Sequence, residues 1–370
     1  MRKKVLFLTA FVPSDVAAAE KNTKIMLQEL SNCFDIDLVY FKYEHEPDYL
    51  PFNDNICIIA AYKNSLFRKL TNILLCPIVY PTFSVRFNYR ILNSLKKRIL
   101  KVKYDAIIFD HSQMFLYAKA LHVNCPKIML SHDVIAQRVK RNSNKVIELI
   151  CKESENYCLN VKNSYVFSFS PKDCDIIRQL YGIDVRLCLD YIDPYSINAN
   201  PKHIENSYVF IGKWSRADNL DGVIWFYNTI VPHINKPVVI NIIGKNFPKE
   251  KISYDNPMVT TKILGFVENP YELIANSKAM LAPLFTGAGI KVKVIESLAC
   301  GTPVIGTEIA FEGLPDKYSK MMLLANDVDS YLKAMEMNIS IEERKRIKKE
   351  FIADYTSETI PQFLIKLLKS

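Results

Sequence analysis

Glycine is absent from the first 181 residues of this chain of 370, and all ten glycines lie at Gly182 or later. Turns with a left-handed backbone and close approach of a backbone to a ligand both favour glycine. The first half therefore lacks the glycine-rich loop that holds phosphate in many nucleotide-binding proteins. We expect a phosphate site of this kind only in the second half.

Closely spaced cysteines are also absent, since the nine cysteines occur singly and none belongs to a Cys-x-x-Cys pair. Zinc sites and disulfide frameworks need clustered or paired cysteines, so the sequence predicts neither and favours a reducing cytoplasm. No stretch approaches the roughly 18 consecutive apolar residues of a membrane-spanning helix. The apolar run Val5–Val12 is too short and too strand-like for a signal peptide.

Acidic residues are missing between Asn55 and Tyr104, where ten lysines and arginines occur in a chain of net charge +9. The same block is rich in aliphatic and aromatic residues, a combination that suits an anionic membrane surface. One alternative is a basic, solvated helix covering a sheet, next to a buried apolar loop. Nucleic acid is disfavoured because no nucleic-acid-binding module accompanies the charge. We expect residues 55–104 to hold a cytoplasmic protein peripherally at the inner face of the membrane.

The length is too great for one ordinary core and suits two domains. In the first half, short β-rich apolar runs such as Val5–Thr9, Ala106–Phe109 and Lys127–Leu130 alternate with helical stretches. This pattern predicts a parallel sheet with crossover helices. A linker rich in Asn, Pro, Tyr and Ser precedes a second alternation, which runs from Tyr208 to Leu324.

The most informative stretch is Leu284–Thr307, with the sequence LFTGAGIKVKVIESLACGTPVIGT. It follows an apolar run that reads as a buried strand. Gly287 and Gly289 bracket a turn, a helical pattern begins at Ile290, and Gly301 ends that helix. The pattern is therefore a strand, a glycine turn and a helix start.

Such a helix start favours a phosphate. Backbone N–H groups made approachable by two glycines form an anion site, which Lys291 or Lys293 would reinforce. Glu296 lies further along the helix and suits neutral hydroxyls, such as those of a ribose. Taken alone, the pattern also fits an ordinary amphipathic helix with solvated lysines.

This stretch resembles the second domain of the retaining family 4 (group 1) glycosyltransferases. That domain carries a Gly-x-Gly turn, a Lys, a Glu and a Leu-Ala-x-Gly-x-Pro-Val-x-x-Thr tail. The matching positions here are Gly287, Gly289, Lys293, Glu296 and Leu298–Thr307. Two further blocks, Phe210–Pro232 and Leu264–Ser277, match in the family's order.

The resemblance implies an α/β fold of the GT-B type, with two Rossmann-like domains facing across a cleft. An acceptor-side domain would span 1–190, a linker 191–207 and a nucleotide-sugar-binding domain 208–350, and a C-terminal helix in 351–370 would pack back on the first domain. The implied reaction moves a sugar from a nucleotide diphosphate sugar to a lipid-linked or polysaccharide acceptor, with retention, in surface polysaccharide assembly.

The resemblance also implies roles for individual residues. Arg216, Lys291 and Lys293 would hold the leaving diphosphate, and Lys293 matches the family position better than Lys291. Glu296 would bind the ribose, and backbone atoms near Val267 the base. No cofactor or metal is expected, because the Asp-x-Asp pairs of this chain, Asp35/Asp37, Asp173/Asp175 and Asp327/Asp329, have simpler explanations at strand and helix starts.

Two histidines, His111 and His132, each follow a predicted strand, where parallel α/β sheets place their ligands. A single histidine is more often structural, but the resemblance favours His132 as a contact of the donor sugar. Ala288 marks a departure, because many family members have a carboxylate at this position for the hydroxyls of that sugar. Backbone N–H groups of the turn or His132 would have to replace it.

Two other functions stay open. A non-catalytic, membrane-associated protein of the same fold that binds a glycan or a partner gains support from Ala288 and from the missing N-terminal glycines. An NAD-dependent oxidoreductase is disfavoured, because the Gly-x-Gly turn lacks a third glycine and lies far from the N-terminus.

Overall fold

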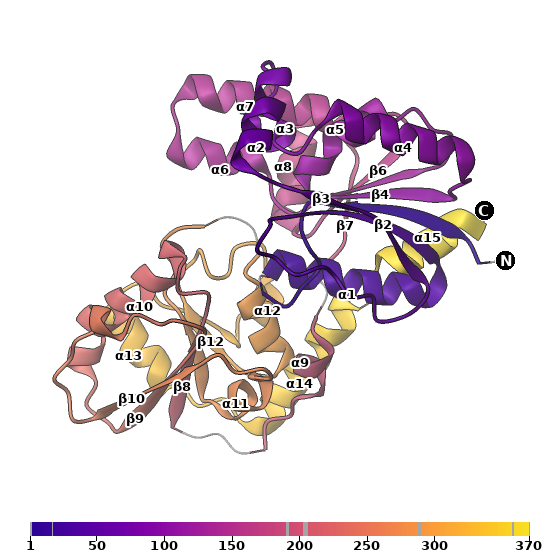
Figure 1. Ribbon diagram of the computed structural model, residues 1–370. Coiled ribbons are helices and arrows are strands. Elements are labelled where there is room, and N and C mark those ends of the chain that lie inside the picture. The colour runs from indigo at the N-terminus through magenta and orange to yellow at the C-terminus, as the bar shows by residue number, and fades with distance from the viewer. Residues whose placement is uncertain are drawn as a thin grey trace. The chain divides into compact units, whose positions relative to one another are not determined.

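The computed structural model describes residues 2–16, 18–189, 192–202, 206–287, 290–356 and 359–369. The chain forms two compact units, one made of Met1–Leu189 with Glu358–Ser370 and the other of Asp190–Ser357. Each unit is built on a parallel sheet flanked by helices (Figure 1). Among the described residues, no helix combines the length and the apolar character needed to cross a bilayer.

The first unit contains a seven-stranded sheet in the order β3-β2-β1-β4-β5-β6-β7. Its strands are β1 (Lys4–Thr9), β2 (Asp35–Lys42), β3 (Ile56–Lys63), β4 (Ala106–Asp110), β5 (Lys127–Ser131), β6 (Ser164–Ser168) and β7 (Val185–Leu187). Every neighbouring pair is parallel. The chain order reverses between β1 and β4, and the carboxyl ends beside such a reversal are where open α/β sheets bind ligands.

The helices of the first unit connect these strands. They are α1 (Ala18–Cys33), α2 (Leu66–Leu75), α3 (Pro81–Ser84), α4 (Tyr89–Lys101), α5 (Phe115–Ala120), α6 (Ile135–Asn142), α7 (Lys145–Leu159), α8 (Pro171–Tyr181) and α15 (Ile360–Lys369), with a 3₁₀ turn η1 (Ser112–Met114). α8 shows how the sequence sets their ends. The side chain of Ser170 accepts from the backbone N–H of Asp173 at its start, and Gly182 takes the left-handed conformation at its end.

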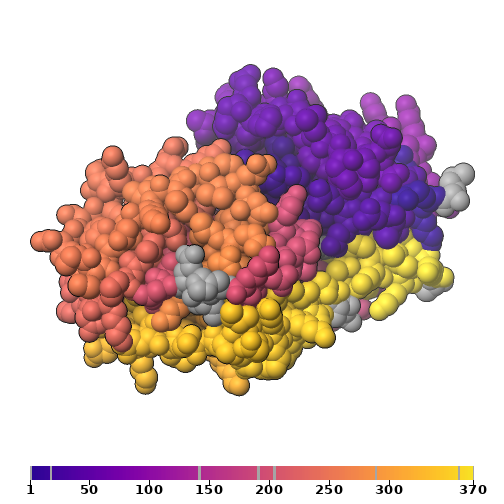
Figure 2. Space-filling view, turned by 90° about the horizontal axis from the view of Figure 1, so that it is seen from below, coloured from indigo at the N-terminus to yellow at the C-terminus, as the bar shows by residue number. Residues whose placement is uncertain are grey.

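The last helix of the chain belongs to the first unit. α15 contacts α1 (Figures 1 and 2), and Phe363 packs edge-on against Tyr165 and Phe167 of β6. The preceding helix, α14 (Ile341–Tyr355), belongs to the second unit. The segment that joins the first unit therefore begins at Glu358, later than the position 351 proposed from the sequence.

The second unit contains a six-stranded parallel sheet in the order β10-β9-β8-β11-β12-β13. Its strands are β8 (Ser207–Ile211), β9 (Val238–Ile243), β10 (Val259–Gly265), β11 (Ala279–Ala282), β12 (Val304–Gly306) and β13 (Met322–Leu324). Its remaining helices are α9 (Pro194–Asn198), α10 (Ala217–Thr229), α11 (Tyr271–Asn276), α12 (Val292–Ala299) and α13 (Val328–Glu336), with 3₁₀ turns η2 (Val231–His233), η3 (Lys249–Lys251) and η4 (Asp316–Tyr318).

Candidate functional site

A glycine lies at the carboxyl end of each of three adjacent strands in the second unit. Gly212 follows β8, Gly244 follows β9 and Gly265 ends β10. A Cβ on Gly244, whose φ is +136°, would lie only 2.1 Å from the carbonyl oxygen of Gly212. The backbones at this edge therefore approach each other in a way that no other residue allows. This edge is not among the sites predicted from the sequence, although a glycine follows or ends each of these apolar runs.

The glycine turn before α12 lies at the same end of the sheet. Gly287 has a φ of +120°, a conformation that favours glycine, and a Cβ at this position would lie in ordinary contact with Lys291 Cε at 3.5 Å and Asp218 Oδ2 at 4.0 Å. Ala288 and Gly289 lie outside the described residues. α12 begins at Val292, two residues later than the pattern predicted, and Lys291 is its N-cap residue.

The three predicted phosphate ligands, Arg216, Lys291 and Lys293, lie near this turn, and each contacts a neighbouring polar side chain. Arg216 precedes α10 and forms two hydrogen bonds with Asp218, from Nε to Oδ1 at 3.0 Å and from Nη2 to Oδ2 at 2.6 Å. Lys293 Nζ donates to Asn219 Oδ1 at 2.8 Å. These contacts bring the starts of α10 and α12 together.

Arg216, Lys291 and Lys293 form a cation cluster, in which the charges of Arg216 and Lys291 both act on Lys293. Burial lowers the pKa of Lys293 to about 8; the charge of Asp218 opposes this shift, and the charges of Arg216 and Lys291 add to it. For Asp218, burial acts to raise the pKa, but the hydrogen bonds and charge of Arg216 outweigh it and hold the pKa below its usual range. The cluster is thus close-packed, positive and partly neutralised by its own unit.

Carboxylates supply that neutralisation. Besides Asp218, Glu312 lies with Oε2 at 3.7 Å from Lys291 Nζ, and both side chains are largely buried. Neither acid was singled out from the sequence. The polar run Arg216-Ala217-Asp218-Asn219, in the loop after β8 and the start of α10, could have indicated Asp218 as part of a site. No pattern in the sequence indicates Glu312.

Glu296, the predicted ribose ligand, is buried on α12 and is tied to the start of the second unit. The hydroxyl of Tyr271 lies 2.8 Å from Glu296 Oε1 and 3.0 Å from Asp193 Oδ2. The hydroxyl of Tyr271 therefore lies between the two acids, and its single proton can be donated to only one of them at a time. Burial and these two carboxylates raise the pKa of Tyr271, which therefore stays protonated.

Val267, predicted near the base, lies partly buried in the loop after β10. Its neighbour Phe266 is exposed, and the ammonium of Lys245 lies 4.6 Å from the centroid of that ring. An exposed aromatic ring beside a glycine-lined strand edge is a suitable surface for a flat base.

A second cluster lies at the carboxyl edge of the sheet in the first unit, around Asp110 at the end of β4. The hydroxyls of Thr9 and Thr23 donate to Asp110 Oδ2 at 2.8 and 2.7 Å, and His132 Nε2 lies 2.7 Å from Oδ1. Burial acts to raise the pKa of Asp110, but the charges of His111 and His132 and these hydrogen bonds hold it well below its usual range. Asp110 is thus ionised and fixes the ring of His132.

His111 and His132, both predicted from the sequence, form one aromatic stack. Their ring centroids lie 3.9 Å apart, and His132 stacks in turn on Phe169 at 4.5 Å. His111 has a φ of 73°, unusual for a residue other than glycine. Burial lowers the pKa of His111 to about 3, so that ring is neutral at physiological pH and its charge acts on Asp110 only in strongly acidic solution, where Asp110 itself titrates.

Ligating atoms of Asp110, His111 and His132 lie within 4.8 Å of one another, which is close enough for a metal ion. The two rings are nearly parallel, at 22°. Lone pairs of parallel rings run side by side and do not converge on one ion, and Asp110 already accepts three hydrogen bonds. The geometry suits an oriented histidine better than a metal centre.

The three Asp-x-Asp pairs are used structurally. Asp37 is buried and pairs with Arg98 at 2.8 Å and Lys4 at 3.0 Å. Asp175 pairs with Arg178, and Asp327 caps α13.

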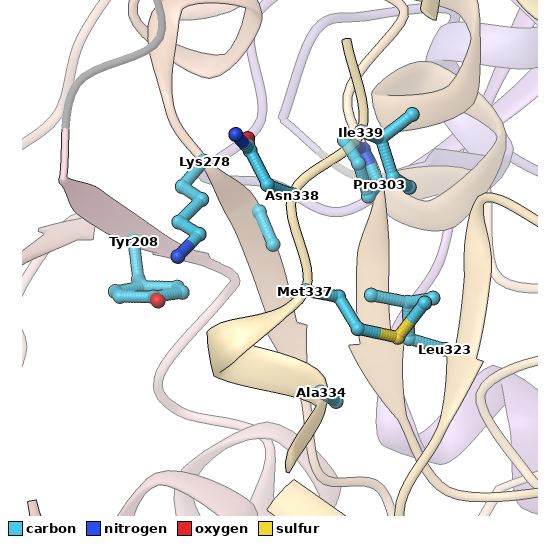
Figure 3. A pocket seen from close by; sticks show the side chains of 9 residues that line it. Tyr208, Lys278, Pro303, Leu323, Ala334, Met337, Asn338 and Ile339 are labelled. Carbon is cyan, nitrogen blue, oxygen red and sulfur yellow. The ribbon is translucent and has the colours of Figure 1, made fainter. Parts of the chain in front are cut away.

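A small cavity of about 10 Å³ lies at the opposite, amino-terminal edge of the second sheet (Figure 3). Its lining comes from the starts of β8 and β11 and from the segment after α13, and includes Tyr208, Lys278 and Met337. It has room for about one water molecule. The cavity is therefore a packing defect and not the functional site.

Comparison with known proteins identifies the second unit. Residues 205–340 match the family model of glycosyl transferases group 1. Over these residues the second unit is thus similar to the group 1 glycosyltransferases. The resemblance seen in the sequence blocks is thus confirmed for the unit that holds the cation cluster.

Two curated relatives match this chain over a longer stretch. An uncharacterised 44.6 kDa protein in the cps region of Klebsiella pneumoniae is 20% identical over 317 residues, 79% of each chain. The capsular polysaccharide biosynthesis glycosyltransferase CapH of Staphylococcus aureus is 19% identical over 242 residues, 63% of this chain and 66% of that one.

Solved structures match along the whole chain. Sucrose-phosphate synthase from Thermosynechococcus elongatus aligns with a TM-score of 0.68 at 12% identity, covering 100% of this chain and 98% of the other. Anabaena HepE, solved in complex with UDP and glucose, aligns with a TM-score of 0.61 at 12% identity, with the same coverage. These matches confirm the predicted α/β fold of the GT-B type.

Proposed function

We propose that this glycosyltransferase moves a sugar from a nucleotide diphosphate sugar to a lipid-linked or polysaccharide acceptor, with retention at the anomeric carbon, in surface polysaccharide assembly. The observation that carries the proposal is the cation cluster beside the Gly287 turn in a group 1 domain. The name of CapH and the UDP bound to HepE support a nucleotide sugar and a polysaccharide product.

The difficult step is departure of the nucleoside diphosphate, which gains negative charge as the glycosidic bond breaks. Arg216 and Lys293 would stabilise that charge, with Lys291 and the backbone of the glycine turn. In the ligand-free protein Arg216 is held by Asp218. We propose that a phosphate oxygen takes over part of this hydrogen bonding when the donor binds, and that neither a metal nor a cofactor is required.

The remaining donor contacts follow from the same unit. Glu296 would accept hydrogen bonds from the ribose, in an orientation kept by Tyr271. The base would lie against the glycine-lined ends of β8, β9 and β10, near the backbone of Val267. The sugar has no carboxylate from position 288, so we assign one of its hydroxyls to His132, whose ring is oriented by Asp110.

The first experiment is nucleotide binding by thermal denaturation. UDP or GDP should raise the melting temperature, whereas NAD should not. Slow hydrolysis of a nucleotide sugar by the same preparation then separates an enzyme from a non-catalytic relative that only binds. A chain that binds neither UDP nor GDP would contradict the proposal.

A membrane surface is the second partner that we propose, through α2 of the basic block. Leu66, Phe67 and Leu74 have 79%, 76% and 74% of their surface exposed. A row of large apolar residues on one helix, flanked by basic residues, favours insertion at an anionic interface. The apolar residues of α2 are thus exposed. Phe83 and Phe87 of the same block are buried, and α4 buries Leu92 and Leu95 as a basic helix over the sheet.

A further inference from the structure

Arg86 is a buried cation without a counter-ion. It follows α3 and has only 5% of its surface exposed. Within the described part of the chain, its guanidinium takes part in no ion pair and no hydrogen bond, and its Nε atom is fully buried. Its guanidinium faces the ring of Phe11, whose centroid lies 4.6 Å from Cζ. A cation–π contact offsets only part of the cost of burying an unpaired charge.

The backbone of Arg86 is firmly placed. The hydroxyl of Tyr117 donates to the Arg86 carbonyl at 2.7 Å and accepts from the backbone N–H of Asn88 at 2.9 Å. Phe83 and Phe87, on either side in the sequence, are part of the hydrophobic core. The backbone position of Arg86 is therefore fixed by hydrogen bonds and by the packing of its neighbours in the core.

The position of Arg86 connects it with the histidine stack. The ring of Phe11 that faces the guanidinium also meets His111 edge-on, with centroids 4.9 Å apart. His111 stacks on His132, and His111 Nε2 likewise has no hydrogen-bond partner among the described residues. Two polar groups without a hydrogen bond thus flank one ring at the carboxyl edge of the first sheet, although His111 Nε2 also lies 3.4 Å from Asp110 Oδ2.

The surrounding charges do not supply a partner. The groups whose fields reach Arg86 are Tyr43, Glu46 and His111. Glu46 Oε2 is engaged with the backbone N–H of Tyr43 at 2.6 Å. Burial lowers the pKa of Arg86, and the fields of Tyr43 and Glu46 oppose this shift without forming an ion pair.

We propose that Arg86 binds an oxyanion carried by the acceptor. A guanidinium presents several N–H donors in a planar fork that matches two oxygens of a phosphate or carboxylate. A neutral sugar hydroxyl would leave the buried charge uncompensated. This proposal rests on the proposed function, since it places the acceptor at the unit that holds His132. The oxyanion is either the phosphate of a lipid carrier or the carboxylate of an acidic sugar.

The test uses the full-length protein with UDP present at saturation, so that the donor site is filled. Calorimetric titration with farnesyl diphosphate represents a lipid phosphate, and titration with glucuronate represents a sugar carboxylate. The variants are Arg86→Met, which removes the charge, and Arg86→Lys, which keeps it without the fork. Arg90→Met, at an exposed residue of the next helix, is the matched control.

We expect one of the two anions to bind the wild type and to bind Arg86→Met about ten- to a hundredfold more weakly. Arg86→Lys should lose less, and Arg90→Met nothing. Without ligand, Arg86→Met should melt no lower than the wild type, because an uncompensated buried charge has been removed. UDP affinity should be equal in all variants.

Two results would overturn the proposal. One is a wild type that binds UDP but neither anion. The other is a ligand-free Arg86→Met that melts well below the wild type, since Arg86 would then have a structural partner. Failure of both UDP and GDP to bind is a separate result, which would contradict the glycosyltransferase proposal while an Arg86-dependent anion response would still establish the subsite.

Discussion

The lowered pKa of Lys293 makes nucleotide binding depend on pH in a defined way. Burial places this pKa at about 8 in the free protein. A diphosphate bound at Lys293 Nζ would raise it, because an adjacent anion favours the charged form. Bound protein therefore holds the proton more tightly than free protein, and affinity must fall as the pH rises through the free-state pKa. Below that pKa, affinity should be constant.

The size of the effect follows from the free-state value. Between pH 7 and pH 9, the dissociation constant of UDP or GDP should rise about tenfold, which is about 1.4 kcal/mol. The terminal phosphate, with a pKa of about 6, is ionised throughout this range and adds no slope. Arg216 also stays charged. The ring N–H of uracil or guanine begins to ionise toward pH 9 with every variant, so the part of the slope that Lys293→Arg loses is the part due to Lys293.

Calorimetry at several pH values, with Lys293→Arg and Lys293→Met, measures this dependence. Lys293→Arg keeps its charge and should show a much flatter profile. Lys293→Met should bind weakly at every pH, and Lys262→Met, at an exposed lysine of β10, should behave as the wild type. A wild-type affinity that is unchanged at pH 9, or a Lys293→Arg profile with the wild-type slope, would refute the assignment.

Four further outcomes are expected. Lys293→Ala and Arg216→Ala should each lower turnover on the order of 100-fold while the fold persists, as judged by melting temperature, and normal turnover in both would contradict their role. His132→Ala should lower turnover more than nucleotide affinity, because the contact that we propose for it is to the sugar; equal losses in both would place it elsewhere. Replacing Lys96, Lys97 and Lys101 by Gln should weaken pelleting with anionic liposomes, and equal binding to zwitterionic liposomes would argue against charge-driven docking. Burial raises the pKa of Glu155 to about 7. The carboxyl therefore loses its proton first in the unfolded chain, and the free energy of unfolding should fall by roughly 3 kcal/mol as the pH rises from about 4.5 to 7. Urea unfolding of Glu155→Gln should show less of this slope than the exposed control Glu153→Gln.

The choice of lysines in the liposome experiment comes from the structure. Arg98 lies in the same basic run, but its Nη2 donates to the buried carboxylate of Asp37 at 2.8 Å. Removing Arg98 would leave that acid with one fewer partner and destabilise the first unit. The sequence alone gives no reason to separate Arg98 from its neighbours Lys96 and Lys97.

Local patterns predicted the parts of the site that one element carries. The glycine at 287 was expected from a turn pattern, and the structure gives it a left-handed φ of +120°. Lys293 and Glu296, three residues apart, lie on α12 as the helical spacing required. The strands expected at Val5–Thr9 and Ala106–Phe109 correspond to β1 and β4 within one residue at each end.

Contacts between distant segments could not be predicted in the same way. Thr9, Thr23 and Asp110 come from β1, α1 and β4 and meet only because β1 and β4 are neighbours in the sheet. Nothing in the spacing of these residues along the chain indicates their convergence. Arg86 is similar, since burial of an arginine without a counter-ion is visible only once the surrounding elements are placed.

The neutralisation of the cation cluster bears on how it would act in catalysis. Asp218 and Glu312 offset part of the charge of Arg216, Lys291 and Lys293 before any ligand binds. A diphosphate must compete with these carboxylates, so the net gain on binding the intact donor is a difference between two favourable contacts. As the sugar departs, the diphosphate gains negative charge while the carboxylates do not. The competition therefore shifts toward the phosphates in the transition state, which is the condition for catalysis by differential binding.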